Sequence, residues 1–273
     1  MSVSIQAFAV AEQAIPVKAV YQNLSEHSAE TEKIGMITQV QWSDGTQTEG
    51  IKHCCCAYLV EDEGHHILVD TGIGDLQRIT KAREKHGDRF YLKEVKPLSQ
   101  CLATVDLQPE DIDIVINTHL HWDHCGGNEM FPNASFYMPD SDISMALKAP
   151  CWASHFYPEM RSCVTSVADR MVLISDSMQI TKHVRVIHLG GHTPGSQCVL
   201  VETEDQGIVA LPGDVICKYE NLENNWIGPA GNFWNITELV RAYDLLHEVS
   251  DVIVPSHDWR IFDRFPNGVI AQK

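Results

Sequence analysis

Three histidines and an aspartate lie close together near the middle of the chain, in the order His119, His121, Asp123 and His124. An apolar run at residues 112–116 precedes them and predicts a buried strand. Because side chains alternate along a strand, His119 and His121 can leave its end on the same side. The chain then turns, so Asp123 and His124 can face the same point. Imidazole and carboxylate groups suit zinc, manganese or iron, and two overlapping pairs of ligands predict two metal ions.

The alternative is that these histidines have gathered by chance, because the chain contains fourteen of them. A single histidine is more often a surface or core residue than a ligand. Four ligand-type side chains within six residues at the exit of a strand are much harder to explain in that way. Gly126 and Gly127 follow the cluster and allow the backbone to fold back tightly. We therefore expect a metal site here.

Three further ligand candidates follow predicted strands later in the chain. His192 lies in a loop of glycines and a proline, residues 190–195, that comes after a strand. Asp214 follows the next-but-one strand, and His257 stands at the exit of the last one. Folds that mix helices and strands usually place their sites at the carboxyl ends of strands. These three residues are therefore expected to join the first four.

Length and composition indicate an ordinary globular chain of one large or two small domains. The chain has 273 residues, of which 44% are hydrophobic and 21% are charged. The formal net charge of -17 argues against nucleic acid and anionic membrane surfaces as partners. It says little about the substrate, because bound divalent metal ions would reverse the local field.

Nine cysteines are present, and three of them are consecutive, Cys54, Cys55 and Cys56. Neighbouring residues on a strand point to opposite faces, so these three cannot all bridge one another. The simplest interpretation is buried, reduced thiols in a cytoplasmic protein. The alternative, a thiolate metal site, has no supporting C-x-x-C spacing. Residues 1–10 carry no basic segment of the kind that begins a secretory signal, and no apolar run reaches the length of a membrane span.

Apolar runs predict a strand hairpin at residues 54–60 and 66–69, with the polar residues 61–64 as its turn. Residues 4–20 could form a strand or coil, interrupted by Pro16. Further strands are expected at residues 112–116, 135–138, 172–174, 184–189, 198–201, 208–211 and 252–254.

Helical spacing predicts helices over residues 76–86, after Pro97, over 140–147, and from a cap at Asn235 to about residue 249. The polar residues 21–44 predict a long loop, which could be a lid or could contact a partner chain in a homodimer. The alternation of strands and helices predicts an α/β chain in layers of helix, sheet, sheet and helix.

The whole pattern resembles the metallo-β-lactamase superfamily over residues 54–265. The resemblance is carried by Val69-Asp70-Thr71-Gly72, by residues 118–128, by Phe131-Pro132-Asn133-Ala134 and by Gly191-His192-Thr193-Pro194-Gly195. It implies a single domain, residues 1–273, folded as an αββα sandwich.

The same resemblance implies roles for the candidate ligands. One metal ion would be held by His119, His121 and His192, and a second by Asp123, His124 and His257. Asp214 would bridge the two, together with a hydroxide. Asp70 resembles an acid that orients ligand imidazoles, and the alternative is that it caps the helix after it. Zn²⁺ is the expected metal, with Fe, Mn and Co as alternatives.

Two such cations lower the pKa of a shared water, which predicts hydrolysis of an ester-like bond without a protein nucleophile. One metal ion would also stabilise the oxyanion, and Asp123 can pass a proton to the leaving alkoxide. A G-x-S-x-G nucleophile motif is not found in the sequence.

Within the superfamily the chain looks most similar to N-acyl-homoserine lactonases, which act in quorum quenching, and to 4-pyridoxolactonase. Length, the stretch from Asp214 to Glu223 and the ending Ser256-His257-Asp258 carry this similarity. Those lactonases usually have a tyrosine that binds the lactone carbonyl where this chain has Cys217. Either Tyr219 takes its place as a catalytic and substrate-binding residue, or the substrate differs, for example an aromatic lactone.

Aromatic residues could line a substrate pocket, although ordinary packing explains each of them equally well; they are Trp152, Phe156, Tyr157, Trp226, Phe233 and Trp234.

Other activities of the same fold are less well supported. A glyoxalase II-like thioester hydrolase shares residues 118–128 but carries a helical domain after its last metal ligand, and only sixteen residues follow His257. A persulfide dioxygenase-like oxidoreductase would use one iron and fewer ligands. An exported β-lactamase would have a signal, and a binding protein would be expected to have lost ligands.

Overall fold

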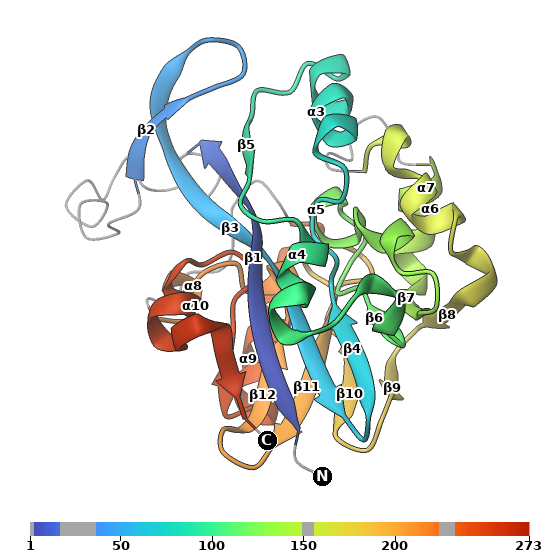
Figure 1. Cartoon of the computed structure of the whole chain (residues 1–273). Helices are drawn as coiled ribbons and strands as arrows, with labels where there is room; N and C mark the ends of the chain where they lie inside the picture. The colour runs from blue at the N-terminus through green and yellow to red at the C-terminus, as the bar shows by residue number, and fades with distance from the viewer. Residues whose placement is uncertain (1–2, 17–36, 149–155, 224–232, 273) are drawn as a thin grey trace.

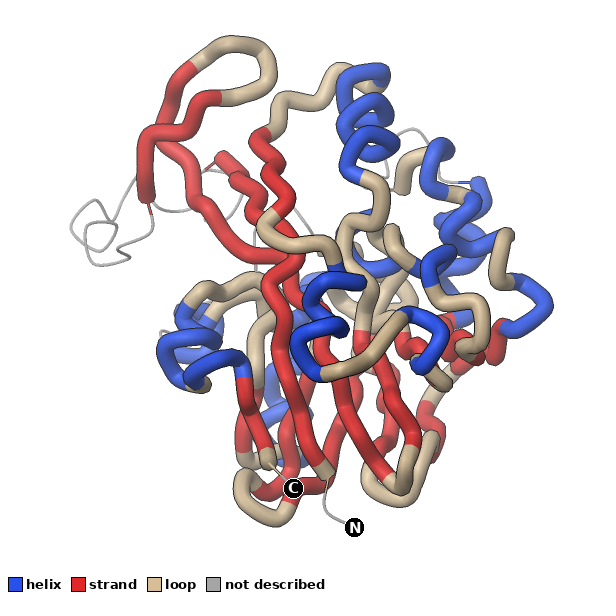
Figure 2. The backbone as a smooth tube through the Cα atoms, viewed as in Figure 1, coloured by secondary structure: helices blue, strands red, loops and turns tan. Residues whose placement is uncertain are grey.

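Two β-sheets face each other and carry helices on their outer faces, as Figures 1 and 2 show. The computed structural model describes residues 3–16, 37–148, 156–223 and 233–272. This is the layered α/β arrangement that the sequence predicts. Within the described residues, none of the helices has the length and apolar character needed to cross a membrane.

The first sheet combines an antiparallel half and a parallel half. Its main path runs β14-β1-β3-β4-β6-β7-β8, with β2 added on β3 and β5 added on β1. The antiparallel half contains β1 (Ser4–Pro16), β2 (Ile37–Gln41), β3 (Gln47–Asp62), β4 (His65–Val69), β5 (Tyr91–Glu94) and β14 (Val269–Ala271). The parallel half continues from β4 through β6 (Ile114–Ile116), β7 (Ser135–Pro139) and β8 (Met171–Ile174).

The second sheet has the order β13-β12-β11-β10-β9. Its strands are β9 (Ser177–Gln179), β10 (Val184–His188), β11 (Gln197–Thr203), β12 (Gly207–Leu211) and β13 (Val252–Ile253). All its pairs are antiparallel except β12 with β13. Because β12 and β13 run parallel, the residues that follow these two strands emerge at the same end of the sheet.

Helices that connect the parallel strands cover the outer face of the first sheet. They are α3 (Leu76–Lys85), α4 (Leu98–Leu102), α5 (Trp122–Cys125), α6 (Asp140–Lys148) and α7 (Ser162–Thr165). Helix α9 (Ile236–Val249) covers the second sheet, where Leu239, Ala242, Tyr243 and Leu246 are buried. Two short helices, α8 (Tyr219–Glu223) and α10 (Arg260–Arg264), lie at one side of the sandwich.

Strand alternation separates the core into layers. On β3, Cys54, Cys56 and Tyr58 belong to the apolar cluster between the two sheets. Cys55 and Ala57, from the same strand, belong to the cluster beneath the outer helices. The prediction of buried thiols is confirmed for the three consecutive cysteines, which are free and at most 3% exposed.

The predicted hairpin of residues 54–69 is confirmed, with a two-residue turn at Glu63 and Gly64. Both residues have positive φ, 52° and 89°, and such turns match the right-handed twist of the flanking strands. The first strand is longer than predicted, because β3 begins at Gln47 and its residues 50–61 pair with β1.

The prediction of a continuous loop over residues 21–44 is wrong for its last part. Residues 37–41 form β2, which pairs with the N-terminal half of β3. Val40 and Trp42 are buried against Ala14, which gives this segment a small core of its own. Residues 21–36 lie outside the described residues. The strands β5, β9 and β14 were not predicted, because each is short and lies at an edge of its sheet.

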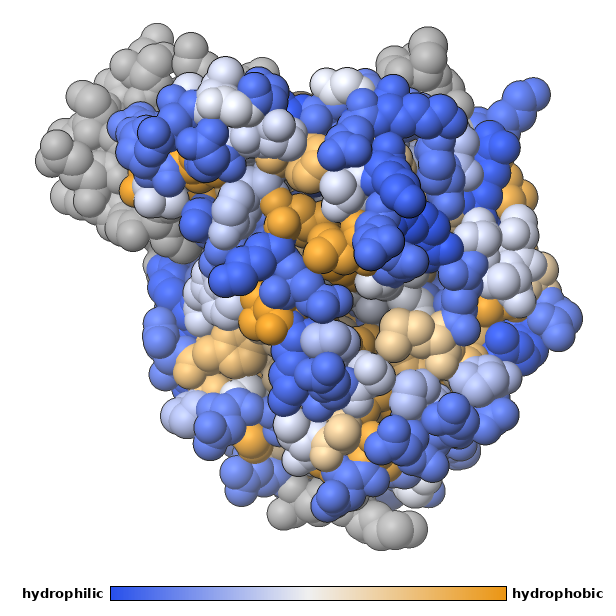
Figure 3. Space-filling model, turned by 45° about the horizontal axis from the view of Figure 1, so that its top comes forward, coloured by the Kyte–Doolittle hydropathy of each residue, from blue (hydrophilic) through white to orange (hydrophobic). Residues whose placement is uncertain are grey.

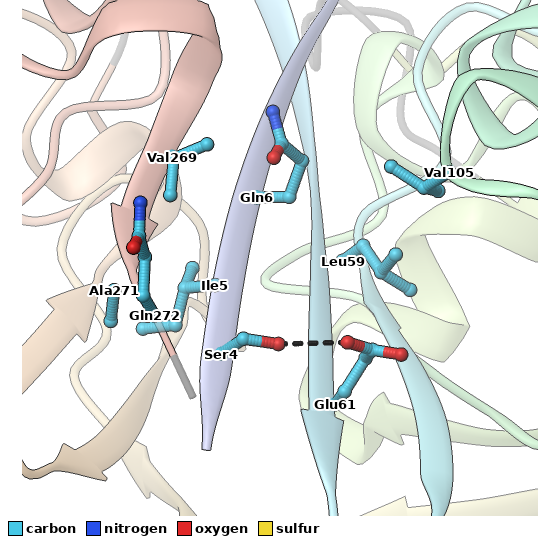
Figure 4. Close-up of a pocket in the computed structure, with 9 residues that line it drawn as sticks. All are labelled: Ser4, Ile5, Gln6, Leu59, Glu61, Val105, Val269, Ala271 and Gln272. Carbon is cyan, nitrogen blue, oxygen red and sulfur yellow. Dashed lines mark hydrogen bonds between the residues drawn. The ribbon is translucent and has the colours of Figure 1, made fainter. Parts of the chain in front are cut away.

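A shallow surface pocket of about 330 Å³ lies at the start of β1, as Figure 4 shows. Ser4, Gln6, Leu59 and Glu61 line it, and the Ser4 hydroxyl donates a hydrogen bond to Glu61 at 2.9 Å.

Asp62 links the two sheets and supports a prediction about stability. Its carboxylate accepts hydrogen bonds from the main-chain N–H and Nδ1 of His183 at 3.0 and 2.7 Å, and from the hydroxyl of Thr181. Burial would raise the pKa of Asp62, but the bonds from Thr181 and His183 lower it overall. We expect Asp62→Asn to lower the free energy of unfolding by about 1–3 kcal/mol at pH 7, because an amide nitrogen would face donors.

The pH dependence of this effect has a definite sign. A lowered carboxylate pKa stabilises the fold fully above the unfolded-state value of 3.8, and this stabilisation is lost as the pH falls through the folded-state pKa. Denaturant unfolding of both proteins at pH 7 and at low pH tests it. A difference between the two proteins that grows on acidification would contradict the assignment.

Candidate metal centre

All seven ligand candidates lie at the carboxyl ends of strands. His119 and His121 follow β6, and α5 then carries Asp123 and His124. His192 lies between β10 and β11, Asp214 lies in the turn after β12, and His257 follows β13. Each is buried, with at most 7% of its surface exposed. Figure 3 looks onto this end of the molecule, where apolar side chains gather between hydrophilic rims.

His119, His121, His192 and Asp214 form one group whose potential ligand atoms lie within 4.8 Å of one another. The Nδ1 atom of His121 lies 3.0 Å from Nε2 of His119 and 3.1 Å from Nε2 of His192. Asp214 Oδ2 lies 3.4 Å from the His192 nitrogen and 4.0 Å from that of His119. Three imidazole nitrogens and a carboxylate oxygen therefore converge on one point.

A second group contains His124, His257 and Asp214. Asp214 Oδ1 lies 3.1 Å from Nε2 of His124 and 2.9 Å from Nε2 of His257. Asp123 stands beside this group, with its oxygens 4.0 Å from the His124 nitrogen and 3.7 Å from the His257 nitrogen. The two oxygens of Asp214 thus face different groups, as a bridging carboxylate requires.

Asp70 orients two of the imidazoles. Its Oδ2 accepts a hydrogen bond from Nδ1 of His124 at 2.7 Å and from the Thr118 hydroxyl at 2.8 Å. The Thr118 oxygen in turn lies 3.1 Å from Nδ1 of His119. The alternative role of Asp70 as a helix cap is wrong, because Asp75 caps α3 through the N–H groups of its first turn. Asp75 is the residue next to that helix, so it reaches those groups first.

The hydrogen bonds of His124 and His257 indicate that this set of ligand atoms fits bound cations. Nδ1 of His124 donates to Asp70, and Nδ1 of His257 donates to the Cys54 carbonyl at 2.6 Å. In the neutral imidazole the lone pair is then on Nε2, which in both residues faces carboxylate oxygens. Nε2 of His124 is buried without a hydrogen bond. A cation between these lone pairs and carboxylates would satisfy both.

The pKa shifts of the candidate ligands in the metal-free protein also fit a cation-binding site. Burial would lower the pKa of His124, but the carboxylates of Asp214, Asp70 and Asp123 raise it well above its usual value. Burial would raise the pKa of Asp214, but His257 and His124 hold it well below its usual range. Burial and the neighbouring imidazoles of His124, His121 and His192 lower the pKa of His119. The second group therefore attracts positive charge, whereas His119 in the first group favours the neutral imidazole.

Asp142, on α6, ties together two loops that carry candidate ligands. Its Oδ2 accepts from the N–H of Leu120 at 3.1 Å and the hydroxyl of Thr193 at 2.9 Å, and its Oδ1 accepts from the N–H of Gly195 at 2.7 Å. Burial raises the pKa of Asp142 to about 6. Asp142 was not among the predicted site residues, because a single aspartate in a predicted helix carries no local signal of such contacts.

Two glycine positions allow the loops to approach closely. Gly213 has φ +55°, and a Cβ there would lie 2.4 Å from the Thr118 hydroxyl. Gly191 has φ +86°, and a Cβ there would lie 2.7 Å from Leu239 on α9. The loops that present Asp214 and His192 therefore need glycine both for backbone conformation and for space.

The structure brings some of the predicted substrate residues to the site. The ring of Phe156 packs edge-on against His121, with 4.6 Å between ring centres. Cys217 is partly exposed, and its thiol donates to the Asp214 carbonyl at 3.3 Å. Phe233 is 39% exposed. Trp152 and Trp226 lie outside the described residues.

Tyr219 has a different environment from the one predicted. It is buried in the cluster between the sheets, and the Arg264 guanidinium lies 3.6 Å from its ring centre. Burial raises the pKa of Tyr219 to about 12. This placement does not favour contact with a substrate, and we do not retain Tyr219 as a catalytic residue. Tyr157 also faces elsewhere, because its hydroxyl donates to Asp88.

The chain is similar in sequence to known hydrolases. The model of the metallo-beta-lactamase superfamily matches residues 55–139. An N-acyl homoserine lactonase of Bacillus sp is 30% identical over 174 residues, which cover 61% of this chain and 66% of that protein. An N-acyl homoserine lactonase of Bacillus thuringiensis is 28% identical over 174 residues, with the same shares. The matched part is thus just under two thirds of the length of these relatives.

Solved structures match over nearly the whole chain. An N-acyl homoserine lactone hydrolase with N-hexanoyl-L-homoserine at its catalytic metal centre has a TM-score of 0.74 and 20% identity, covering 97% of both chains. AidC, a dizinc quorum-quenching lactonase, has a TM-score of 0.71 and 16% identity, covering 99% of this chain and 90% of that one. At these identities the likeness concerns the fold, and it confirms the predicted αββα sandwich.

Proposed function

Since the chain belongs to the metallo-β-lactamase superfamily, we propose that it is a metal-dependent hydrolase that opens a lactone ring. The observation that carries this proposal is the pair of adjacent ligand groups that share Asp214. The relatives of similar sequence are N-acyl homoserine lactonases, which makes a lactone the first substrate class to consider.

Two divalent ions, with Zn²⁺ as the first choice, would be held by the ligands that the sequence predicts. His119, His121 and His192 would hold one, and Asp123, His124 and His257 the other, with Asp214 between them. When bound, such ions lower the pKa of a water and polarise an ester carbonyl.

Other side chains of the protein would orient the metal ligands, transfer a proton and contact the substrate. Asp70 keeps the Nε2 lone pair of His124 directed at the site, and it does the same for His119 through Thr118. Asp123 offers a carboxylate that can carry a proton to the alkoxide formed when the ring opens. Phe156 supplies an apolar surface beside His121 for part of the substrate.

The substrate we propose is an N-acyl homoserine lactone or an aromatic lactone. The resemblance to lactonases implies a carbonyl-binding tyrosine at the position of Cys217, and Tyr219 is buried between the sheets. The lactone carbonyl therefore has no phenol at that position to bind it. We expect this to reduce the preference for acyl homoserine substrates relative to other lactones.

A hydrolysis screen of metal-loaded protein tests the proposal. It compares acyl homoserine lactones, simple γ- and δ-lactones, aromatic lactones and S-lactoylglutathione by acid release, with metal content measured on the same sample. Turnover of a lactone with about two metal ions per chain is the expected result. Turnover of the thioester alone would replace lactonase with a glyoxalase II-like activity, and one iron without hydrolysis would point to a persulfide dioxygenase-like oxidoreductase.

A further inference from the structure

A third group of potential ligands includes a cysteine from the first sheet. Cys55, Asp123 and His257 are all buried, and their potential ligand atoms lie within 4.8 Å of one another. Asp123 and His257 are already candidates for the second metal ion. The group therefore adds a sulfur donor to that site, from a strand that the ligand motif does not include.

The consecutive cysteines of β3 do not share one role. Cys54 and Cys56 face the space between the sheets, where their sulfur atoms lie 3.4 Å apart. Cys55 points to the opposite face, toward α5 and Asp123. The alternation of the strand therefore presents only the middle thiol to the metal site.

The backbone of the same strand also fixes His257. The Cys54 carbonyl accepts the hydrogen bond from Nδ1 of His257, which leaves Nε2 as the ligand atom. That atom faces Asp123 and Asp214. The main chain of β3 thus orients His257, and the next side chain on the strand, Cys55, is a further candidate ligand.

A second observation points to a cation at this place. Nε2 of His124 is buried without a hydrogen bond, and it faces Asp214 Oδ1 at 3.1 Å and Asp123 Oδ1 at 4.0 Å. A buried ring nitrogen without a hydrogen bond is costly unless something else binds it. A metal ion held by His124 and His257 beside Asp123 would do so, and the sulfur of Cys55 lies within 4.8 Å of the ligand atoms of Asp123 and His257.

Gln13 completes the surroundings of this group. This residue of β1 is 6% exposed, and its side-chain amide donates to Asp123 Oδ2 at 2.7 Å. The same Oδ2 atom lies 3.7 Å from Nε2 of His257. Gln13 was not among the predicted site residues, because a glutamine in an N-terminal strand carries no metal-binding signal.

We propose that the Cys55 thiolate is a ligand of the second metal ion, beside Asp123 and His257. The proposal rests on the proposed metal-dependent function and makes the second site a mixed sulfur, oxygen and nitrogen site. Zn²⁺ and Co²⁺ accept all three donor types. On binding, the S–H bond breaks, the sulfur keeps the electron pair and forms the bond to the metal, and the proton passes to solvent.

X-ray absorption at the zinc edge of protein carrying two equivalents of Zn²⁺ is the first test. A sulfur shell at about 2.3 Å is expected in the native protein and should be lost in Cys55→Ala. With Co²⁺, a thiolate charge-transfer band in the near ultraviolet should behave in the same way. The second equivalent should bind at least about tenfold more weakly in Cys55→Ala, with the first unchanged.

Two further variants test whether the sulfur signal comes from Cys55 or from another cysteine. Cys198→Ala removes another fully buried thiol, from the second sheet, and should keep the sulfur signal. Cys217→Ala removes the thiol beside Asp214 and should also keep it. A signal that survives in Cys55→Ala, or that disappears in Cys217→Ala, would overturn the proposal.

The native protein gives an answer even if Cys55→Ala does not fold. Two bound metal ions without sulfur scattering would overturn the Cys55 assignment while leaving the hydrolase proposal intact. If no metal binds at all, both proposals fail. If sulfur scattering is present and Cys217→Ala retains it, Cys55 is supported.

Discussion

Replacing Asp214 with alanine is expected to remove metal ions from both sites and to lower kcat/KM at least about 10³-fold, which corresponds to about 4 kcal/mol. The reason is geometric. Asp214 is the one residue shared by the two ligand groups, and each of its oxygens faces a different group. Metal content by mass spectrometry and lactone hydrolysis on the same sample measure both effects.

Asp244→Ala is the matched control, because Asp244 is an exposed carboxylate on α9. It should keep both metal ions and full activity. Asp214→Asn retains one carbonyl oxygen and should retain more metal than the alanine variant. Two metal ions and native activity in Asp214→Ala would refute its role as the shared ligand.

The second large effect is expected at Asp70. Asparagine tolerates the left-handed backbone of this position, φ 61°, so Asp70→Asn should fold. Its amide cannot accept all the hydrogen bonds that come from His124 and Thr118. We expect metal affinity to fall by about 10- to 100-fold, because the imidazoles lose their orientation. Competition with a chelator of known affinity measures this.

Asp70→Ala should also lower the free energy of unfolding, by about 2–4 kcal/mol, since it leaves buried donors unpaired and places alanine at a positive φ. A variant at Asp106 separates the effect of the unpaired donors from the effect of alanine at a positive φ. It has nearly the same φ, 60°, but is exposed. Asp106→Ala should show the backbone effect alone, with metal affinity unchanged. Equal losses of metal affinity in the Asp106 and Asp70 variants would contradict the orienting role of Asp70.

Much of the site could be predicted because its signals are local. His119 to His124 form one short segment, and the carboxyl ends of strands are marked by apolar runs that end at glycine, proline or ligand residues. The hairpin at residues 61–64 was predictable for the same reason, since a polar turn with a glycine separates two apolar runs. Such patterns depend on neighbours in sequence, which the chain displays directly.

The edge strands could not be predicted in this way. β2 pairs with the extended half of β3, and only Val40 of its five residues is fully buried. A strand so exposed has almost no apolar alternation, and its conformation comes from the partner that offers hydrogen bonds. The position of Tyr219 also depends on the tertiary structure. Its proximity in sequence to Asp214 suggested a place in the site, but the turn after Asp214 directs its ring into the core between the sheets.

The sequence by itself determined the layered α/β class, the seven candidate ligands and the strand ends at which they stand, because residue type and short-range spacing are sufficient for these. Only the tertiary structure decided what surrounds the ligands. Gln13, Cys55 and Asp142 come from β1, β3 and α6, and each reaches the candidate metal centre through pairing or packing of segments far apart in the chain. Such contacts are set by strand register and helix placement, which no local pattern specifies.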